Sequence, residues 1–135
     1  MQTSKCEPSY GPTNPSPEAQ SNSEVRRFGS VVGLNPEKEN AYRELHSDAW
    51  PSILGRIRKS NMRNFSIYTT EIEGKKFLFS YFEYVGQDFE ADMKAIADDP
   101  ETKRWWKETD PCQLPLPTRK PDAIWSEMEM VFLAK

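Results

Sequence analysis

The chain contains one histidine, two cysteines and six glycines among 135 residues, and each scarcity excludes a class of protein. One histidine with Cys6 and Cys112 cannot supply the usual zinc ligands, and two cysteines do not form a disulfide framework. The glycines are scattered singly, so no phosphate-binding loop is present. We therefore expect no metal, nucleotide or other cofactor, and a reducing, cytoplasmic compartment.

Charge and hydropathy exclude two further classes. The 18 basic and 21 acidic residues give a net charge of −3, without the basic stripe that a nucleic-acid-binding protein needs. The sequence has no run of about 18 apolar residues, so no membrane span is expected. It also begins without the apolar segment of a secretory signal. A hydrophobic content of 36% is enough for one core in a single domain.

Residues 1–24 have the composition of a disordered tail. Pro8, Pro12, Pro15 and Pro17 alternate with serine, asparagine and glutamine, and apolar residues are almost absent. Such a segment cannot bury enough surface to offset the entropy lost on ordering. The folded domain is therefore expected to occupy residues 25–135.

Alternating apolar residues predict four strands in that domain, over residues 27–34, 64–70, 76–84 and 125–133. A turn is expected at 71–75 and a proline-rich loop at 111–121. The first helix is expected to begin at Asn35-Pro36, to restart at Pro51 and to end near Ser60-Asn61, because a proline ring clashes inside a helix. A second helix is expected from Phe89 to Ala97, followed after Pro100 by a short helix with two tryptophans.

The predicted order is β-α-β-β-α-β. It favours an α+β, ferredoxin-like fold, in which an antiparallel sheet carries both helices on one face. The strand over 76–84 is apolar on both sides, with Phe77, Phe79 and Tyr81 on one of them. A second copy of the chain is expected to cover the open sheet face, which predicts a homodimer.

The single histidine, His46, lies four residues from Tyr42 and four from Trp50. On a helix these three side chains would share one face, which places a group that titrates near neutrality beside flat aromatic rings. That combination suits a sugar, which offers an apolar ring face and hydroxyl protons. Trp105-Trp106 could form a second stacking surface. A histidine that fills space between aromatic rings, and tryptophans that pack in the core, are the alternatives.

Several polar residues could assist the histidine. Tyr68 is a candidate hydrogen-bond donor, and the carboxylates of Glu83, Glu127 and Glu129 could orient an imidazole or accept a sugar hydroxyl. Asp48 points elsewhere, because residues two apart on a helix do not face each other. Each carboxylate could equally be solvated or ion-paired.

Several strings of residues resemble one known family. The pattern Tyr42-x-x-x-His46-x-x-x-Trp50-Pro51, followed by Asp98-Asp99-Pro100 and Arg104-Trp105-Trp106 and by the ending Val131-Phe132-Leu133, resembles the L-rhamnose mutarotase family over about residues 26–134. The resemblance implies a cofactor-free, dimeric ferredoxin-like protein of the α+β barrel type that interconverts the α and β anomers of a 6-deoxy sugar. It implies that His46 is the acid/base group, with Tyr42 beside it and both tryptophans lining the sugar site.

The chain departs from the family at two positions. Many relatives have a tyrosine where this chain has Phe65, and an acidic residue where it has Met130. We predict an aldose 1-epimerase acting on L-rhamnose or a similar sugar, and the alternative is a non-catalytic module that binds a small ligand or a partner. The predicted site comprises a catalytic residue and its substrate-binding neighbours: His46, Tyr42, Phe65, Tyr68, Trp105 and Trp106. Tyr42 or Tyr68 is expected to be the second proton-transfer group, ahead of water.

Overall fold

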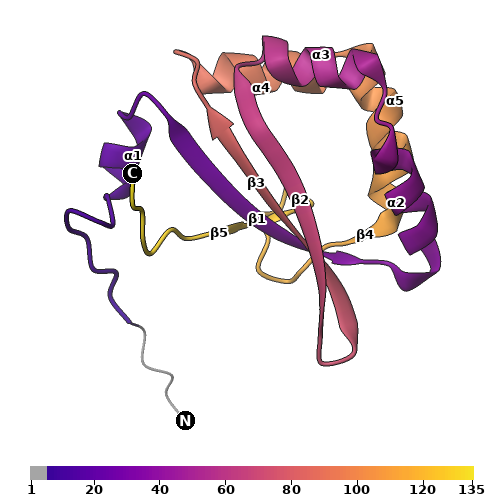
Figure 1. Ribbon diagram of the computed structural model, residues 1–135, viewed down its shortest axis with the longest axis horizontal. Helices are drawn as coiled ribbons and strands as arrows, with labels where there is room; N and C mark the ends of the chain where they lie inside the picture. The colour runs from indigo at the N-terminus through magenta and orange to yellow at the C-terminus, as the bar shows by residue number, and fades with distance from the viewer. Residues whose placement is uncertain (1–5) are drawn as a thin grey trace.

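The computed structural model describes residues 6–135 and shows a curved antiparallel sheet with helices arranged along it (Figure 1). Its strands are β1 (Arg26–Leu34), β2 (Met62–Ile72), β3 (Lys75–Tyr84), β4 (Gln113–Leu114) and β5 (Ser126–Met128). The sheet order is β2-β3-β1-β4, and β5 pairs with β1 on the same edge as β4. This is the ferredoxin-like order with its last strand in two short pieces, so the predicted α+β fold is confirmed.

The helices that follow β1 connect these strands as the sequence predicts, and α1 precedes β1 in the predicted tail. They are α1 (Pro17–Ser21), η1 (Pro36–Lys38), α2 (Glu39–Ser47), α3 (Pro51–Lys59), α4 (Phe89–Asp98), α5 (Pro100–Thr109) and η2 (Asp110–Cys112). Asn35 caps the short helix η1 by accepting a hydrogen bond from Glu37 N. The Asp99 side chain caps α5 by accepting one from Thr102 N. These two caps explain why η1 and α5 begin where they do.

The predicted interruption at Pro51 has a consequence for the site. Helix α2 ends at Ser47 and α3 begins at Pro51, so Trp50 is the extended cap residue of α3 and not part of α2. The expectation that Tyr42, His46 and Trp50 share one helix face is therefore wrong for Trp50. The two residues that do share α2 lie together, because the rings of Tyr42 and His46 are 4.1 Å apart.

Helices α2 and α4 pack on the same face of the sheet. The register pairs Phe28 with Phe82 and Val32 with Leu78, which places these four side chains on one face. The Phe28 ring stacks on Phe89 of α4 at 4.8 Å, and Val32 and Leu78 belong to the same buried cluster as Tyr42 of α2. The prediction of helices on one face is thus confirmed.

The opposite face of the sheet is less covered. Phe79 lies across from Val31 on one side and from Tyr68 on the other, and Tyr81 is the next aromatic on that face. The Tyr68 side chain is 62% exposed, and those of Phe79 and Tyr81 are half-buried. The predicted two-sided apolar character of β3 is present in the structure.

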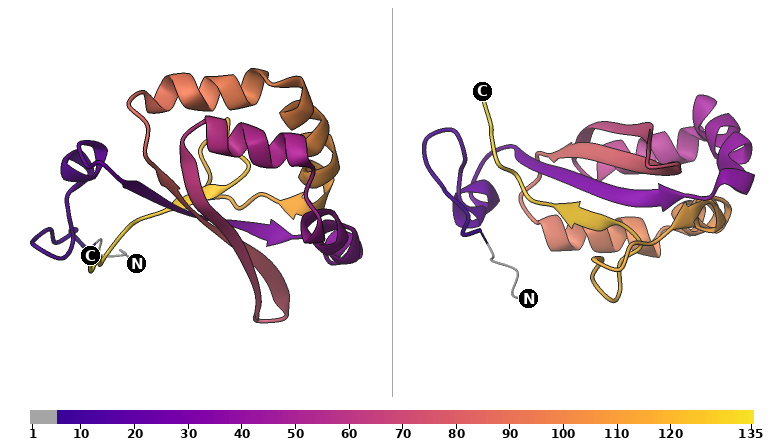
Figure 2. Two further views of the ribbon diagram at one scale, coloured as in Figure 1. Left: turned by 45° about the horizontal axis from the view of Figure 1, so that its top comes forward. Right: turned by 90° about the horizontal axis from the view of Figure 1, so that it is seen from below.

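Three boundaries differ from the sequence-based expectation. The hairpin turn is shorter than 71–75, because Glu73 and Gly74 both adopt positive φ and close a two-residue turn. The proline-rich segment contains the short strand β4. The last strand ends at Met128 instead of Leu133, because the chain leaves β1 there and Leu133 N donates to Thr13 O of the N-terminal segment (Figure 2).

The predicted tail lies partly outside the described residues, which exclude 1–5. In the described part, helix α1 begins after Ser16, whose hydroxyl accepts a hydrogen bond from Ala19 N. The disorder of residues 1–24 stays a prediction.

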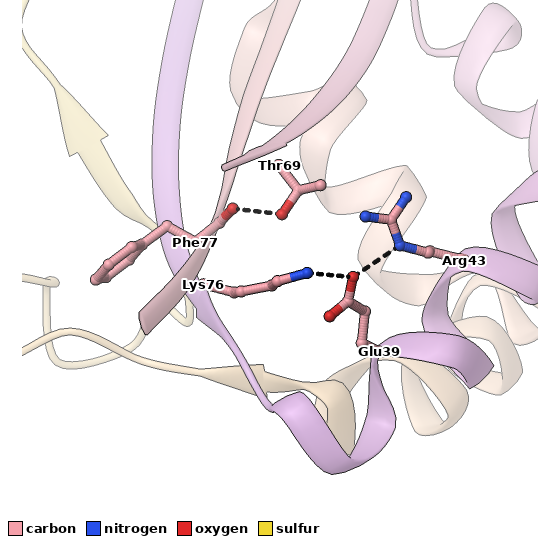
Figure 3. A network of polar contacts seen from close by, with 5 residues as sticks. All are labelled: Glu39, Arg43, Thr69, Lys76 and Phe77. Atoms are coloured by element: carbon pink, nitrogen blue, oxygen red, sulfur yellow. Dashed lines mark hydrogen bonds and ion pairs between the residues drawn. The ribbon is translucent and has the colours of Figure 1, made fainter. Parts of the chain in front are cut away.

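One ion-pair network attaches α2 to the hairpin. A single carboxylate oxygen of Glu39 accepts from Lys76 Nζ at 2.9 Å and from Arg43 Nε at 2.8 Å (Figure 3). The hydrogen bond from Lys76, followed by the one from Arg43, holds the pKa of Glu39 below its ordinary value. Because Lys76 belongs to β3, this network fixes the start of the helix that carries Tyr42 and His46.

Gly86 is expected to tolerate no side chain. A Cβ there would collide with the Tyr84 hydroxyl, which itself donates to the Asp92 carboxylate. We expect Gly86→Ala to lower the free energy of unfolding by about 1–3 kcal/mol. Gly55 in α3 is the matched control, because a Cβ there meets open space and alanine is expected to raise stability by about 0.5–1 kcal/mol. Urea unfolding of both variants checks this pair, and an equal effect at the two positions would contradict it.

Candidate active site

A cavity of about 420 Å³ opens between the helices and the sheet face on which α2 and α4 pack. Its lining comes from every layer of the fold: Ser30, Tyr42, His46, Phe65, Ile67, Ser80, Phe82, Trp105, Trp106, Thr109, Asp110, Gln113, Asp122, Ile124 and Trp125. A cavity of this size with apolar walls and a few polar groups is typical of a small-molecule site. Of the six predicted site residues, Tyr68 alone is not in this lining.

His46 has a defined protonation pattern. Its Nδ1 lies 2.7 Å from the Tyr42 carbonyl oxygen, which can only accept, so Nδ1 carries the hydrogen. Nε2 then holds a free lone pair and is the proton-accepting atom of the ring. Burial lowers the pKa of His46 below its ordinary value, and the hydrogen bond to Tyr42 O opposes this in part. The imidazole is therefore neutral at neutral pH and able to act as a base.

Aromatic rings hold the imidazole on two sides. The Tyr42 ring is tilted against it at 4.1 Å, and the Trp105 ring meets it edge-on at 5.1 Å. Trp105 in turn packs edge-on against Trp50 at 5.1 Å, and the Arg104 guanidinium lies 5.0 Å from the centre of the Trp50 ring. Trp50 therefore supports the site from behind, through Trp105.

The two adjacent tryptophans of α5 differ in burial. Trp105 is 8% exposed and Trp106 is 41% exposed, yet both line the cavity. Successive residues on a helix point about 100° apart, which explains how one packs inward while its neighbour faces the opening. The exposed indole face of Trp106 is available for stacking on a ligand.

The hydroxyl of Tyr42 is the most unusual polar group of the cavity. Its residue is 4% exposed, and its oxygen has no hydrogen-bond partner within residues 6–135. Burial raises the pKa of Tyr42 to about 12; the nearby Gln113 side chain opposes the rise without forming a hydrogen bond. An unpaired buried hydroxyl costs roughly 1–3 kcal/mol, so this group is suited to a ligand hydroxyl.

Phe65 and Tyr68 lie in different places although both come from β2. The Phe65 ring is 41% exposed at the cavity, where it packs against Phe82 at 5.6 Å. Tyr68 instead borders a second hollow of about 240 Å³, which shares Tyr42 and His46 with the first. The structure thus brings five of the six predicted residues together around one space and places Tyr68 beside the adjoining one.

The carboxylates of the cavity are not those that the sequence suggested. Glu83 accepts hydrogen bonds from Asn64 and Tyr81, and Glu127 pairs with Lys120 at 3.3 Å. Glu129 and Asp48 are exposed and do not line the cavity.

Asp110 and Asp122 provide the carboxylates of the cavity instead. Asp110 follows Trp106 by four residues, a helical spacing that could have revealed it, whereas the irregular segment around Asp122 offers no periodic signal. Ser30, Ser80, Gln113 and Trp125 were also missed, because isolated residues that come from different segments of the chain form no motif.

Two features bear on cofactors and membranes. Within residues 6–135, no group of three or more histidine, cysteine, aspartate or glutamate side chains has the arrangement of a metal site. No helix in the described part of the chain combines the length and the apolar character needed to cross a bilayer.

The fold and the site together define an α+β protein with one histidine in an aromatic-walled cavity of about 420 Å³, and comparison with known proteins gives its family. The family model described as "L-rhamnose mutarotase" matches residues 27–134. The chain belongs to the L-rhamnose mutarotase family, whose members are carbohydrate isomerases. The predicted family and the predicted mutarotase-like isomerase class are confirmed.

Individual relatives support this family assignment. The L-rhamnose mutarotase of Bacillus subtilis (strain 168) is 28% identical over 87 residues, covering 64% of this chain and 79% of the relative. That of Listeria monocytogenes serovar 1/2a is 25% identical over 100 residues, covering 74% and 91%. A crystal structure of an L-rhamnose mutarotase from Formosa agariphila has a TM-score of 0.60 at 22% identity and covers 82% of this chain and 99% of that one, which supports the fold.

Proposed function

We propose that the protein is an aldose 1-epimerase that interconverts the α and β anomers of a 6-deoxy sugar, L-rhamnose first, by cofactor-free acid/base catalysis at His46. The observation that carries the proposal is the neutral imidazole. Its Nδ1 donates to Tyr42 O at 2.7 Å, and its Nε2 has no hydrogen-bond partner among residues 6–135, in a ring that lines an aromatic cavity. The relatives named as L-rhamnose mutarotases support the choice of sugar.

The proposed reaction needs two proton movements and no redox step. Nε2 of His46 takes the proton of the anomeric hydroxyl while the C1–O5 bond breaks and O5 gains a proton. The aldehyde then rotates about C1–C2, and the same steps run backwards to close the other anomer. A positioned acid/base group accelerates such a step by roughly 10²–10⁴-fold.

The cavity walls suit the rest of the sugar. Trp106 offers an exposed indole face for the ring, and the buried Tyr42 hydroxyl offers a hydrogen bond to a sugar hydroxyl. Phe65, Ile67 and Phe82 form an apolar wall along β2 and β3. We assign the deoxy methyl group to this wall, because a 6-hydroxyl would lose its hydrogen bonds there.

Saturation transfer between the anomeric ¹H signals of L-rhamnose tests the proposal. We expect catalytic amounts of the protein to raise the exchange rate well above that in buffer, with the hydroxymethyl sugar L-mannose exchanging more slowly than L-rhamnose. Line broadening of the sugar without faster exchange would contradict catalysis and leave a sugar-binding module.

The proposal includes a homodimer and a cytoplasmic location. The sheet face around Phe79, Tyr81 and the exposed Tyr68 is apolar and carries none of the helices α2, α3, α4 and α5, which supports a second copy of the chain as its cover. The thiols of Cys6 and Cys112 are not bonded to each other, which is consistent with a reducing compartment. Light scattering is expected to give twice the mass of one chain, and a monomer at micromolar concentration would contradict the dimer.

A further inference from the structure

We propose that Asp110 is the second proton-transfer group of this site and serves the ring oxygen while His46 serves the anomeric hydroxyl. The inference rests on the proposed function and adds a residue to it. Both residues line the same cavity, and Asp110 lies four residues after Trp106, the indole that is free to stack on a sugar.

The position of Asp110 is fixed by its neighbours in the chain. It starts the short helix η2, which directly continues α5. The other end of η2 is anchored, because Cys112 is 3% exposed and its carbonyl oxygen accepts a hydrogen bond from Asn35 N at 2.8 Å. The backbone of Asp110, at the junction of α5 and η2, therefore keeps its place relative to the tryptophans of α5, as the position of a proton-transfer group must.

The Asp110 carboxylate also lacks the partners that other carboxylates of the chain have. Hydrogen-bonding partners lower the pKa of five of them: Glu39, Glu83, Asp92, Asp98 and Asp99. Asp110 differs, because no described residue hydrogen-bonds or ion-pairs its side chain. The residue is exposed to solvent where it lines the cavity, and its partial desolvation there raises its pKa. A carboxylate left unpaired in a cavity is more typical of a functional group than of a structural one.

Few titratable groups lie near Asp110. The other titratable groups of the cavity are His46, Tyr42 and Asp122. In the elements packed against η2, Lys38 of η1 and Glu108 of α5 act on the neighbouring thiol of Cys112. Neither shifts the pKa of Asp110, for which burial is the sole cause.

The competing candidates for the second group are weaker. The Tyr42 phenol has a pKa near 12 and is poorly matched to proton transfer at neutral pH. Tyr68 borders the adjoining hollow and not the cavity. Asp122 lies in a turn of the irregular segment between β4 and β5, without a helix to fix it.

The proposed step balances. As His46 Nε2 takes the O1 proton, the O1 electron pair forms the C1 carbonyl and the C1–O5 bonding pair moves to O5, which takes the proton of the Asp110 carboxylic acid. On closure, O5 returns its proton to the Asp110 carboxylate and attacks C1, and the carbonyl oxygen recovers a proton from the His46 imidazolium. The step therefore requires the Asp110 carboxyl to be protonated while His46 is neutral, and the pair begins and ends each cycle with that one proton.

The test compares Asp110→Asn with Glu108→Gln, the matched change at an exposed carboxylate of α5 that lies outside the cavity. We expect Asp110→Asn to lower the catalysed exchange of L-rhamnose anomers about 100-fold with KM nearly unchanged. Glu108→Gln is expected to stay close to wild type. The wild-type rate of anomer exchange is expected to fall at alkaline pH, where Asp110 and His46 have lost the proton that they share. In Asp110→Asn the residual rate is expected to rise with pH to a plateau, because neutral His46 then acts alone.

Stability gives a second readout. Because the pKa of Asp110 is raised on folding, its carboxylate costs stability above that pKa, and Asp110→Asn is expected to unfold at an equal or higher temperature than wild type. Wild-type exchange in Asp110→Asn, or equal losses in both variants, would overturn the inference while leaving the proposed function intact. If the wild-type protein does not accelerate anomer exchange, the proposed function itself is contradicted.

Discussion

Replacing His46 with glutamine is expected to abolish nearly all acceleration of anomer exchange, a loss of roughly 10²–10⁴-fold in kcat. The reason is that Nε2 of this ring is the proton-accepting atom in our account of the cavity, while glutamine keeps a side-chain donor for the Tyr42 carbonyl at 2.7 Å. Binding should survive, because Trp106 and the apolar wall remain. Saturation transfer at several L-rhamnose concentrations separates kcat from KM.

The matched control for this variant is Glu44→Gln. Glu44 lies on the same helix, two residues away, and is exposed outside the cavity. It is expected to keep wild-type exchange and a wild-type unfolding temperature. If His46→Gln folds normally and exchanges the anomers as fast as Glu44→Gln does, His46 has no catalytic role.

Replacing Trp105 with alanine is expected to have the largest effect on stability, about 3–5 kcal/mol of unfolding free energy. This indole is 8% exposed and touches both the His46 and the Trp50 rings, so its removal leaves a cavity between α5 and the helices before it. The exchange rate should also fall, because His46 loses the ring that positions it. Urea unfolding followed by circular dichroism measures the first effect.

Trp106→Ala provides the comparison one residue along the same helix. Because Trp106 is 41% exposed, its truncation is expected to cost roughly 1 kcal/mol or less in stability and to raise KM through lost stacking. A larger stability loss at Trp106 than at Trp105 would show that our assignment of the buried and the ligand-facing indole is reversed.

The sequence was sufficient to predict the fold because its signals are local and agree with one another. Asn35-Pro36 and Asp99-Pro100 mark helix starts, and the nearly continuous apolar run of β3 marks a strand that is apolar on both sides. The last strand was not predictable. The alternation that runs from Met128 to Phe132 is typical of a strand. Its pairing with β1 nevertheless ends at Gly29, although β1 itself begins at Arg26, and Leu133 N hydrogen-bonds Thr13 O instead.

The site was predictable where residues on one element share a motif. Tyr42 with His46 and Trp105 with Trp106 are adjacent along single helices, so spacing alone brings each pair together. Trp50 was misplaced because a proline restart turns the helix axis and moves it off the shared face. Asp110 and Asp122 reach the cavity through tertiary packing of short elements, which periodicity does not report.

The most direct test of the account is an NMR titration of the ¹⁵N-labelled ring of His46, which is the one histidine of the chain. We expect the neutral ring to carry its hydrogen on Nδ1, to titrate below the ordinary pKa of 6.5, and to shift its Nε2 signal when L-rhamnose is added. A pKa at or above 6.5, together with a ring signal that L-rhamnose leaves unchanged, would contradict the claim that this imidazole meets the sugar.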